Sequence, residues 1–326
     1  MMDFCILGSG IAGSTIAKLL SKKYSVQVFD KAKGVGGRTS NKRLKKNLSF
    51  DHGAQYISPK SKKFKEFIES LIKKKIIKKW EGNHLDFSFK KKDTAPKYIG
   101  IKGNNDLSKY QLKRVKFSLD SQIVKIEFKK NIWEITLKDD SKHQFKSVIL
   151  TCPYIQTKSL AKSYLSKKLF NLKINMEPNI TLMIAIKNKR KLPINSIRFN
   201  DKILAWAANE NSKERFNSNL NLWTIQSTLS FSKKYINKYK KNFNVINNIQ
   251  SSFLRLTGFE KKNIVYSKIH GWKFSYSGKK TVFKSFWNKN QKFGICADWF
   301  NGPKIEDAWI SAHDLMKKIK KNPLKL

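Results

Sequence analysis

Residues 4–13 read FCILGSGIAG, a short apolar run followed directly by glycines in the spacing GxGxxG. After the last of these glycines, Ile16, Leu19 and Leu20 follow helical spacing, and residues 26–29 (VQVF) alternate as a second strand. A strand, a glycine turn, a helix and a strand form the opening of a doubly wound sheet that binds a dinucleotide at its first turn. The start of the chain therefore predicts a Rossmann-type domain.

The three glycines have separate roles in such a turn. Gly8 permits the tight turn off the strand, Gly10 lets the backbone approach a pyrophosphate, and Gly13 lets the helix pack close to the sheet. The helix that starts at Ile11 and Ala12 directs free N–H groups and its positive dipole end at the phosphates. We therefore expect these five residues to bind a dinucleotide.

Asp30 and a second glycine element indicate which dinucleotide it is. Asp30 ends the second strand, where its carboxylate is placed to accept hydrogen bonds from an adenosine ribose. The sequence GVGGRT at residues 34–39 then brings the chain back beside the pyrophosphate, and the guanidinium of Arg38 offsets its charge. A nicotinamide dehydrogenase does not need this second element, whereas many proteins with a buried FAD have it. We therefore predict FAD, with Gly37 and Arg38 among its ligands.

The rest of the chain alternates between helical and strand-like patterns. An amphipathic helix is expected over 64–72, a strand meander over 121–150, and a strand over 293–297 followed by a helix over 305–319. This predicts an α/β fold in which a Rossmann-type, glutathione-reductase-like FAD-binding domain is interrupted by an α+β substrate domain with a mixed sheet. The predicted boundaries are 1–58, 104–155 and 266–326 for the FAD-binding domain, and 59–103 and 156–265 for the substrate domain.

The charge of the chain bears on its partners. Lys and Arg number 68 against 23 Asp and Glu, giving a formal net charge of +45, but seven of the 68 are Arg. Nucleic-acid readers depend on Arg for bidentate contacts, so the first interpretation is a solvated lysine-rich surface. Attraction of anionic substrates and binding of polyanions are the alternatives. We expect a monomer or dimer that binds a small-molecule substrate, with no specific nucleic acid and no membrane partner.

The cysteines and histidines indicate neither disulfides nor a metal. Cys5, Cys152 and Cys296 lie far apart in apolar runs, which is typical of buried thiols in a reducing compartment. The five histidines lack metal-ligand spacing. The N-terminus lacks the pattern of a signal peptide, and no apolar run approaches the roughly 18 residues of a membrane span. We therefore expect a soluble, cytoplasmic protein without a metal.

Several motifs together resemble the renalase family, within the wider group of flavin amine oxidases. They are GxGxxG at 8–13, Asp30-Lys31, GGR at 36–38, DHGAQY at 51–56, VILTCP at 148–153, HGW at 270–272, GICADW at 294–299, Gly302-Pro303 and EDAW at 306–309. The resemblance runs nearly end to end, although the middle matches only loosely. Two positions depart from it: Asp30 stands where Glu is commoner, and Gly271 stands where relatives often have Arg.

The resemblance implies noncovalent FAD in a two-domain fold. The residues that it implies around the cofactor are Ala12, Asp30, Lys31, Arg38, Gln55 and Tyr56. It also implies that Val124 brackets the adenine through its backbone and that Asp298 hydrogen-bonds the ribityl chain. The helix that begins near Lys304, with Ile305 at the cofactor, would direct its N-terminus at the flavin pyrimidine, where its dipole stabilises an anionic reduced flavin.

The sequence contains no convincing acid–base set, and flavin itself performs hydride or electron transfer. Candidates for the pocket wall or for catalysis are Tyr56, Trp272, Trp299 and Asn301, while His52 is expected to serve local hydrogen bonding. The resemblance implies an NAD(P)-related oxidase that oxidises an isomeric dihydronicotinamide dinucleotide by hydride transfer to flavin, with O₂ giving H₂O₂. The alternatives are a flavin amine oxidase, a desaturase-like enzyme, or a flavin-binding or polyanion-binding protein without turnover.

Overall fold

The computed structural model describes residues 1–44, 48–188, 192–278 and 280–321. The chain forms two compact units, each discontinuous in sequence. The first comprises Met1–Arg38, Asn105–Met176 and Tyr276–Leu326, and the second comprises Thr39–Asn104 and Glu177–Ser275. These boundaries differ from the predicted ones, because residues 39–58 and 266–275 belong to the second unit and residues 156–176 to the first. Strand pairing explains the case of 266–275, which lie in a long strand of the second sheet.

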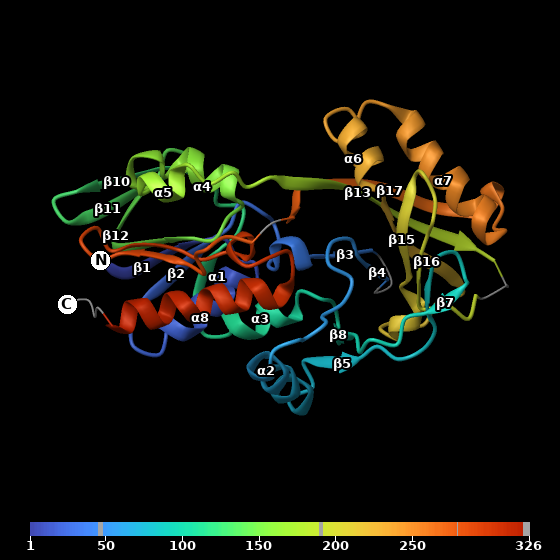
Figure 1. Cartoon of the computed structure of the whole chain (residues 1–326), viewed down its shortest axis with the longest axis horizontal. Coiled ribbons are helices and arrows are strands. Elements are labelled where there is room, and N and C mark those ends of the chain that lie inside the picture. The colour runs from blue at the N-terminus through green and yellow to red at the C-terminus, as the bar shows by residue number, and fades with distance from the viewer. Residues whose placement is uncertain (45–47, 189–191, 279, 322–326) are drawn as a thin grey trace. The chain divides into compact units, whose positions relative to one another are not determined.

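The first unit is built on an eight-stranded sheet. Its parallel strands are, in spatial order, β9 (Lys116–Ser118), β2 (Val26–Phe29), β1 (Met2–Leu7), β12 (Lys142–Leu150) and β19 (Phe293–Ile295). Its antiparallel strands are β10 (Ile123–Lys129), β11 (Ile132–Leu137) and β18 (Phe286–Asn288). Helices α1 (Ile11–Leu20), α3 (Asp106–Leu112) and α8 (Ile305–Lys321) cover one face of the sheet, and α4 (Tyr154–Leu160) and α5 (Lys167–Phe170) lie on the other (Figure 1).

The central strands of this sheet end at a common edge. In the parallel register, Leu7 of β1 pairs with Phe29 of β2 on one side and with Leu150 of β12 on the other. All three side chains are buried, as expected for a parallel sheet that is covered on both faces. The residues that follow these strands therefore gather at the carboxyl edge, where doubly wound sheets bind their ligands.

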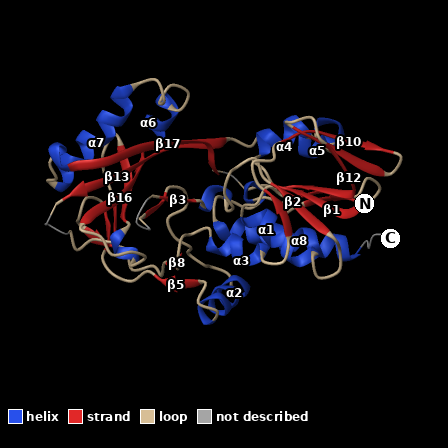
Figure 2. Cartoon of the chain, turned by 180° about the vertical axis from the view of Figure 1, so that it is seen from behind, coloured by secondary structure: helices blue, strands red, loops and turns tan. Residues whose placement is uncertain are grey.

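The second unit is built on a seven-stranded mixed sheet. Its spatial order is β17 (Ile264–Ser277), β13 (Met176–Lys187), β16 (Leu220–Ser227), β15 (Leu204–Asn209), β14 (Ser196–Arg198), β6 (His84–Asp86) and β7 (Lys91–Lys92). Two small sheets accompany it, β3 (Asn41–Arg43) with β4 (Ser49–Asp51), and β5 (Ile77–Lys79) with β8 (Tyr98–Gly100). Helix α2 (Lys62–Lys73) follows the first small sheet, and α6 (Leu229–Tyr235) and α7 (Phe243–Thr257) cover one face of the large sheet (Figure 2).

The two faces of the large sheet have different neighbours. Ile184 of β13 and Trp223 of β16 belong to the core that includes Phe253 of α7. Met183, the neighbour of Ile184, points the other way and packs with Phe50 of β4. Alternate residues of a strand point to opposite faces, so one face of the sheet meets the helices and the other meets the segment around β4. We call the second of these the β4-side face.

The architecture confirms the predicted fold class, a Rossmann-like α/β unit together with a separate mixed sheet. The long strand β17 was not predicted as such, because its alternation is interrupted by lysine and glycine. In the part of the chain that the structure describes, none of the helices combines the length and the apolar character needed to span a bilayer.

Candidate functional site

The first turn after β1 has the geometry of a dinucleotide-binding turn. Gly8 has φ +106° and its N–H donates to the carbonyl oxygen of Phe29, 2.8 Å away. A Cβ on Gly8 would lie 2.6 Å from Oγ1 of Thr151. A Cβ on Gly13 would lie 1.9 Å from the carbonyl oxygen of Gly8, which no real contact allows. Only glycines therefore bring the start of α1 this close to the ends of β1 and β12.

The first turn of α1 offers backbone donors to a ligand. Gly10 is the residue before the helix and gives no side-chain cap, and the first turn contains no acidic residue. The first intrahelical bond runs from Ser14 N–H to the Gly10 carbonyl oxygen, at 2.8 Å. The N–H groups of Ile11 and Ala12 precede it, and helix geometry gives them no acceptor within the helix. Together with the helix dipole, they favour an anion at this point.

Asp30 lies where the ribose carboxylate is expected, directly after β2. Its Oδ2 accepts hydrogen bonds from Ser9 N–H at 2.7 Å and Ser9 Oγ at 2.6 Å, and its Oδ1 accepts from Ala32 N–H at 2.9 Å. A carboxylate has about four lone-pair directions, so these three bonds leave it able to accept another donor. The neighbouring Lys31 is exposed.

The second glycine element returns to the first, as its sequence position predicts. Gly36 N–H donates to the Ser9 carbonyl oxygen at 3.2 Å. Gly37 has φ +54°, and a Cβ built on it would lie 3.3 Å from Cα of Gly10. The two elements thus form one double-glycine cradle, defined here as Gly8–Gly13 together with Gly36 and Gly37, in which the backbone is open to close approach.

Arg38 and Asp298, which lie 260 residues apart, form a bidentate ion pair. Nη1 lies 2.7 Å from Oδ2 and Nη2 lies 2.5 Å from Oδ1. The Asp298 side chain is 5% exposed and that of Arg38 is 30% exposed. Two residues that the sequence places at different parts of the cofactor therefore meet within the first unit. The planar guanidinium fork matches the two oxygens of the carboxylate in this way.

Two other predicted cofactor positions have distinctive backbone surroundings. The pairing of β10 with β11 shifts register between Ile123 and Lys125, so Val124 lies at a β-bulge and is 46% exposed. A bulge leaves its extra residue outside the ladder, which suits a ligand contact through the backbone. At the other position, α8 begins at Ile305, and the Asp307 carboxylate accepts the Lys304 N–H at 2.9 Å. A carboxylate of the chain thus already offsets part of this helix dipole.

Trp299 and Asn301 serve the interior of the first unit. Trp299 is 1% exposed, donates its indole N–H to the Cys152 carbonyl oxygen at 3.1 Å, and stacks on Phe300 with centroids 3.8 Å apart. Asn301 donates to the carbonyl oxygens of Lys284 and Asp307, at 3.4 and 3.3 Å. These contacts give Trp299 a packing role and Asn301 a role in holding the adjacent loops together.

The DHGAQY segment lies in the second unit. Asp51, at the end of β4, is completely buried and takes part in an ion cluster with Lys213 and Arg215. Gln55 donates its side-chain N–H to the Asp51 and Gly53 carbonyl oxygens. Tyr56 is half-buried, with ring centroids 6.4 Å from Trp80 and 6.2 Å from Trp206. Burial raises the pKa of Tyr56, so its phenol stays protonated at neutral pH.

His52, His270 and Trp272 form a second aromatic group in the same unit. The His52 ring lies 4.9 Å from that of His270 and stacks at 5.3 Å on Trp272, whose indole N–H donates to the His52 carbonyl oxygen at 2.8 Å. Burial and the neighbouring His270 lower the pKa of His52 to about 4. Burial and two lysines, Lys240 and Lys268, also lower the pKa of His270. Both imidazoles are therefore neutral at physiological pH.

Gly271, the departure from the HGW pattern of relatives, points away from this aromatic group. A Cβ on Gly271 would lie 2.4 Å from Cε1 of Tyr239 and 2.9 Å from Cδ1 of Ile236. Both residues follow α6 and pack against the core between the sheet and its helices. Position 271 thus faces the helical layer, whereas Trp272 lies on the opposite side of the strand.

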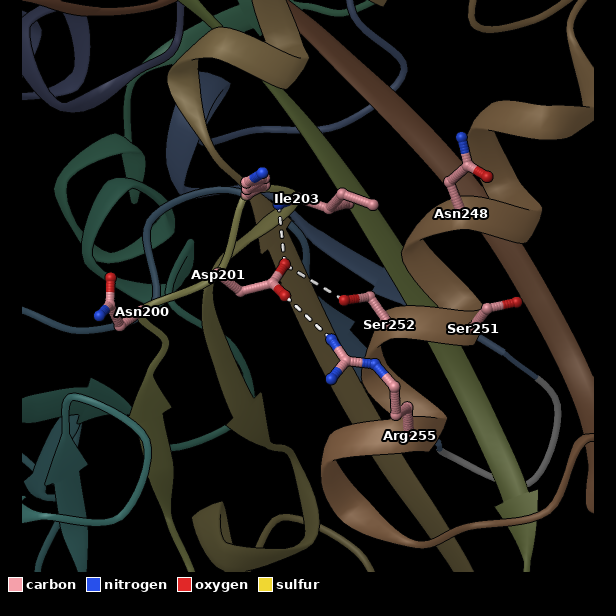
Figure 3. Close-up of a pocket in the computed structure, with 8 residues that line it drawn as sticks. Asn200, Asp201, Ile203, Asn248, Ser251, Ser252 and Arg255 are labelled. Carbon is pink, nitrogen blue, oxygen red and sulfur yellow. Dashed lines mark hydrogen bonds and ion pairs between the residues drawn. The ribbon is translucent and has the colours of Figure 1, made fainter.

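A polar depression of about 730 Å³ lies elsewhere on the second unit (Figure 3). The Asp201 carboxylate at its centre accepts the N–H groups of Ile203 and Leu204, both at 2.8 Å. Figure 3 shows Ser252 and Arg255 of α7 pointing at the same carboxylate, at 3.1 and 3.2 Å. Since these four donors occupy the Asp201 carboxylate, its role is to anchor the surrounding loop. The depression is therefore not the candidate site.

Sequence reasoning missed the buried ions Glu210, Lys213 and Arg215. They lie in the stretch ENSKER at 210–215, whose composition is also typical of an exposed turn. Charged residues are seldom fully buried, so this composition gives no reason to expect burial here. Among the described residues, no three His, Cys, Asp or Glu side chains are grouped to hold a metal.

Comparison with known proteins supports the fold. Residues 6–71 match the family of NAD(P)-binding Rossmann-like domains. Over 98% of its length, the chain is similar to a candidate protoporphyrinogen oxidase from Exiguobacterium sp. 255-15 (TM-score 0.74, 9% identity, 98% of that chain). It is equally similar to a variant of putrescine oxidase (0.74, 11%, 99%) and to cyclohexylamine oxidase from Brevibacterium oxydans IH-35A (0.72, 11%, 99%). The chain has the amine oxidase fold.

Proposed function

We propose that the chain is an FAD-dependent oxidoreductase that removes a hydride from a carbon next to nitrogen, as an amine oxidase does. The observation that carries the proposal is the double-glycine cradle, in which Gly37 packs against Gly10 at the start of α1. Ser9 joins this cradle to Asp30 by two hydrogen bonds. One glycine turn suffices for a nicotinamide dinucleotide, whereas the second element is a feature of many FAD proteins.

The residues of the cradle fit FAD. The N–H groups of Ile11 and Ala12 suit the pyrophosphate, and Asp30 retains lone pairs for ribose hydroxyls. Arg38, which pairs with Asp298, adds a positive charge that suits a phosphate oxygen. When bound, FAD supplies the two-electron acceptor, and the chain supplies position and electrostatics.

The fold supports the amine as the leading substrate class, because solved relatives of the same fold include putrescine oxidase and cyclohexylamine oxidase. In this reaction an amine loses a hydride and a proton and becomes an imine, while O₂ gains two electrons and two protons and becomes H₂O₂. Hydride transfer needs no strong base when the amine is already neutral. The neutral imidazoles of His52 and His270 lie in the second unit, with ring centroids 5.3 and 4.3 Å from that of Trp272, and each can accept a proton.

One observation favours the second candidate, a dihydronicotinamide substrate. The buried carboxylates of the second unit, Asp51 and Glu210, are both paired with Lys213. The positive charges near His270, from Lys240 and Lys268, oppose a cationic amine. A neutral dihydropyridine ring needs no free carboxylate as a partner, and lysines attract the anionic carrier of this ring. Neither feature therefore opposes a dihydronicotinamide.

An anaerobic substrate screen decides between these candidates. The purified protein is expected to be yellow, with absorption near 370 and 450 nm as flavins generally show. Putrescine, cyclohexylamine and other amines are titrated against isomeric dihydronicotinamides, and bleaching of the 450 nm band is followed. Bleaching by amines establishes the leading proposal, and bleaching by dihydronicotinamides alone replaces it with the second candidate.

The remaining outcomes separate the other classes of function. A yellow protein that neither substrate class bleaches is a flavin-binding module without turnover. A colourless protein that refuses added FAD overturns the whole proposal. Tight binding to nucleic acid with a steep dependence on salt would instead identify a polyanion-binding protein. Formation of H₂O₂ on readmission of air tests O₂ as the acceptor.

A further inference from the structure

Four charged side chains form a closed cluster in the interior of the second unit. Lys213 Nζ lies 2.8 Å from Oδ2 of Asp51 and 2.9 Å from Oε2 of Glu210, and Nη1 of Arg215 lies 2.5 Å from the same Asp51 oxygen. The Asp51, Glu210 and Lys213 side chains have no exposed surface, and that of Arg215 is 2% exposed. Two negative and two positive charges thus balance in a site closed to bulk solvent.

Each ion of the cluster also has neutral partners that fix its geometry. Asp51 accepts from Asn41 Nδ2 at 2.9 Å and from Asn104 N–H at 3.0 Å. Glu210 Oε1 accepts from Thr224 Oγ1 at 2.6 Å and from Asp51 N–H at 3.3 Å. Arg215 donates to the Gly100 carbonyl oxygen and to Asn104 Oδ1, both at 3.0 Å. A buried ion pair is tolerated only when such bonds compensate for lost hydration.

The cluster holds the segment Asp51–Tyr56, which we call the cofactor loop. Lys213 holds the loop at two points, because its Nζ donates to Oδ2 of Asp51 and also to Oε1 of Gln55, 3.2 Å away. Asn104 Nδ2 holds the Ala54 carbonyl oxygen at 2.9 Å. The Lys213 ammonium further lies 5.3 Å from the centroid of the Trp80 ring, which excludes water from that side.

We propose that Lys213 is the positioning residue of the cofactor loop, and that the balance of the four charges, not any single ion pair, keeps the loop in place. The name of the loop rests on the proposed FAD-dependent function and on the family resemblance, which implies Gln55 and Tyr56 beside the cofactor, whereas the positioning itself does not. Loss of one charge leaves an uncompensated ion in the interior, and the loop is the part of the cluster that can move to admit water. Removal of one charge of each sign restores neutrality.

The test compares Lys213→Met, Glu210→Gln and the double variant, with hydrogen exchange of amides 53–56 and thermal unfolding as readouts. Each single variant leaves a net charge, so loop exchange is expected to rise at least about 10-fold and Tm to fall by roughly 10 °C. The double variant is expected to recover more than half of both losses. Lys213→Arg retains the charge and should keep slow loop exchange.

An ion pair at the surface of the same unit provides the control. Lys78 pairs with Glu214, the residue after Lys213, at 3.1 Å. Lys78→Met with Glu214→Gln should change Tm by no more than about 2 °C and leave loop exchange as it is. If Lys213→Met does not fold, Glu210→Gln and the double variant still give the comparison. A double variant as impaired as the sum of the singles overturns the proposal.

Failure of this proposal is distinguishable from failure of the proposed function. Exchange and Tm are measured without added FAD, so they report on the loop whether or not the protein is a flavoprotein. In the wild-type background, absence of FAD binding contradicts the proposed function alone. If the wild type binds FAD, the single variants should also shift the absorption bands of the bound flavin, and the charge-balanced double variant should shift them back.

Discussion

The candidate nucleotide site of the first unit is made mostly of backbone, whereas the cofactor loop of the second unit is held by charged side chains. In the first, Gly8, Gly13 and Gly37 leave room for chain to pass against chain, with approaches that a single Cβ would prevent. In the second, Asp51 is paired with Lys213, 162 residues later, and the interaction depends on both charges.

This difference predicts opposite sensitivities. A backbone site responds to added volume and is indifferent to pH, because its donors and acceptors do not titrate. A site held by buried ionisable groups is sensitive to charge substitutions and to pH, because protonation changes the net charge that is buried in the interior. The predictions below test each half of that comparison, beginning with the largest effect.

Gly13→Ala should give the largest loss. Its Cβ would lie 1.9 Å from the backbone oxygen of Gly8, so α1 must move away from the sheet. We expect destabilisation of about 4 kcal/mol by urea denaturation and loss of bound FAD. Gly34→Ala is the matched control, since nothing lies within 4 Å of the added methyl group, and it should change stability by less than about 0.5 kcal/mol. Normal stability and flavin content in Gly13→Ala would show that the close approach is not required.

His52 should make the second unit sensitive to acid. Its pKa is about 4 in the folded chain and 6.5 as its ordinary value. Between pH 6.5 and pH 4, His52 is protonated in the unfolded chain but neutral in the folded chain. The free energy of unfolding is therefore highest above pH 6.5 and decreases as the pH falls to about 4. The loss amounts to about 3 kcal/mol over that window. Burial lowers the pKa of His270 too, which acts in the same direction.

Urea denaturation at pH 7, 6 and 5 checks this. His52→Asn should lose clearly less stability than the wild type between pH 7 and pH 5, while His143→Asn, on β12 of the first unit, should follow the wild type. Parallel curves for the wild type and His52→Asn would mean that the His52 ring is not protected from protonation.

The same contrast explains what the sequence could predict. The cradle lies within the first 40 residues. Gly8, Gly10 and Gly13 have the spacing of a strand–turn–helix unit, and Gly36 and Gly37 follow soon after the second strand, so the sequence alone could predict the cradle. The pairing of Arg38 with Asp298 spans 260 residues, and spacing carries no information about it. Glu210 and Lys213 were missed because the solvated and the buried forms of such a turn have the same composition. Their burial depends on where β4 brings Asp51, which is a property of the folded chain alone.

Arg38→Ala should have an intermediate effect, on cofactor binding and on stability. It removes charge-assisted donors and leaves the 5%-exposed Asp298 carboxylate without its partner. We expect the Kd for FAD to rise about 10- to 100-fold, measured by flavin fluorescence. Adding Asp298→Asn should restore stability but not FAD affinity. Arg43→Ala, an exposed arginine on β3, serves as control and should bind FAD as the wild type does.

Gly271→Ala should give the smallest effect, and it brings the volume test to the second unit. The added methyl group meets the far end of the Tyr239 side chain, 2.4 Å away, and a side chain can move where the backbone behind Gly13 cannot. The cost is therefore about 1 kcal/mol, and Gly271→Ala in a Tyr239→Ala background should cost clearly less, because only the contact with Cδ1 of Ile236, at 2.9 Å, then remains. Because position 271 faces the helical layer, KM for the substrate found in the screen should stay unchanged. A variant of normal stability with an altered KM would instead place this residue against the substrate.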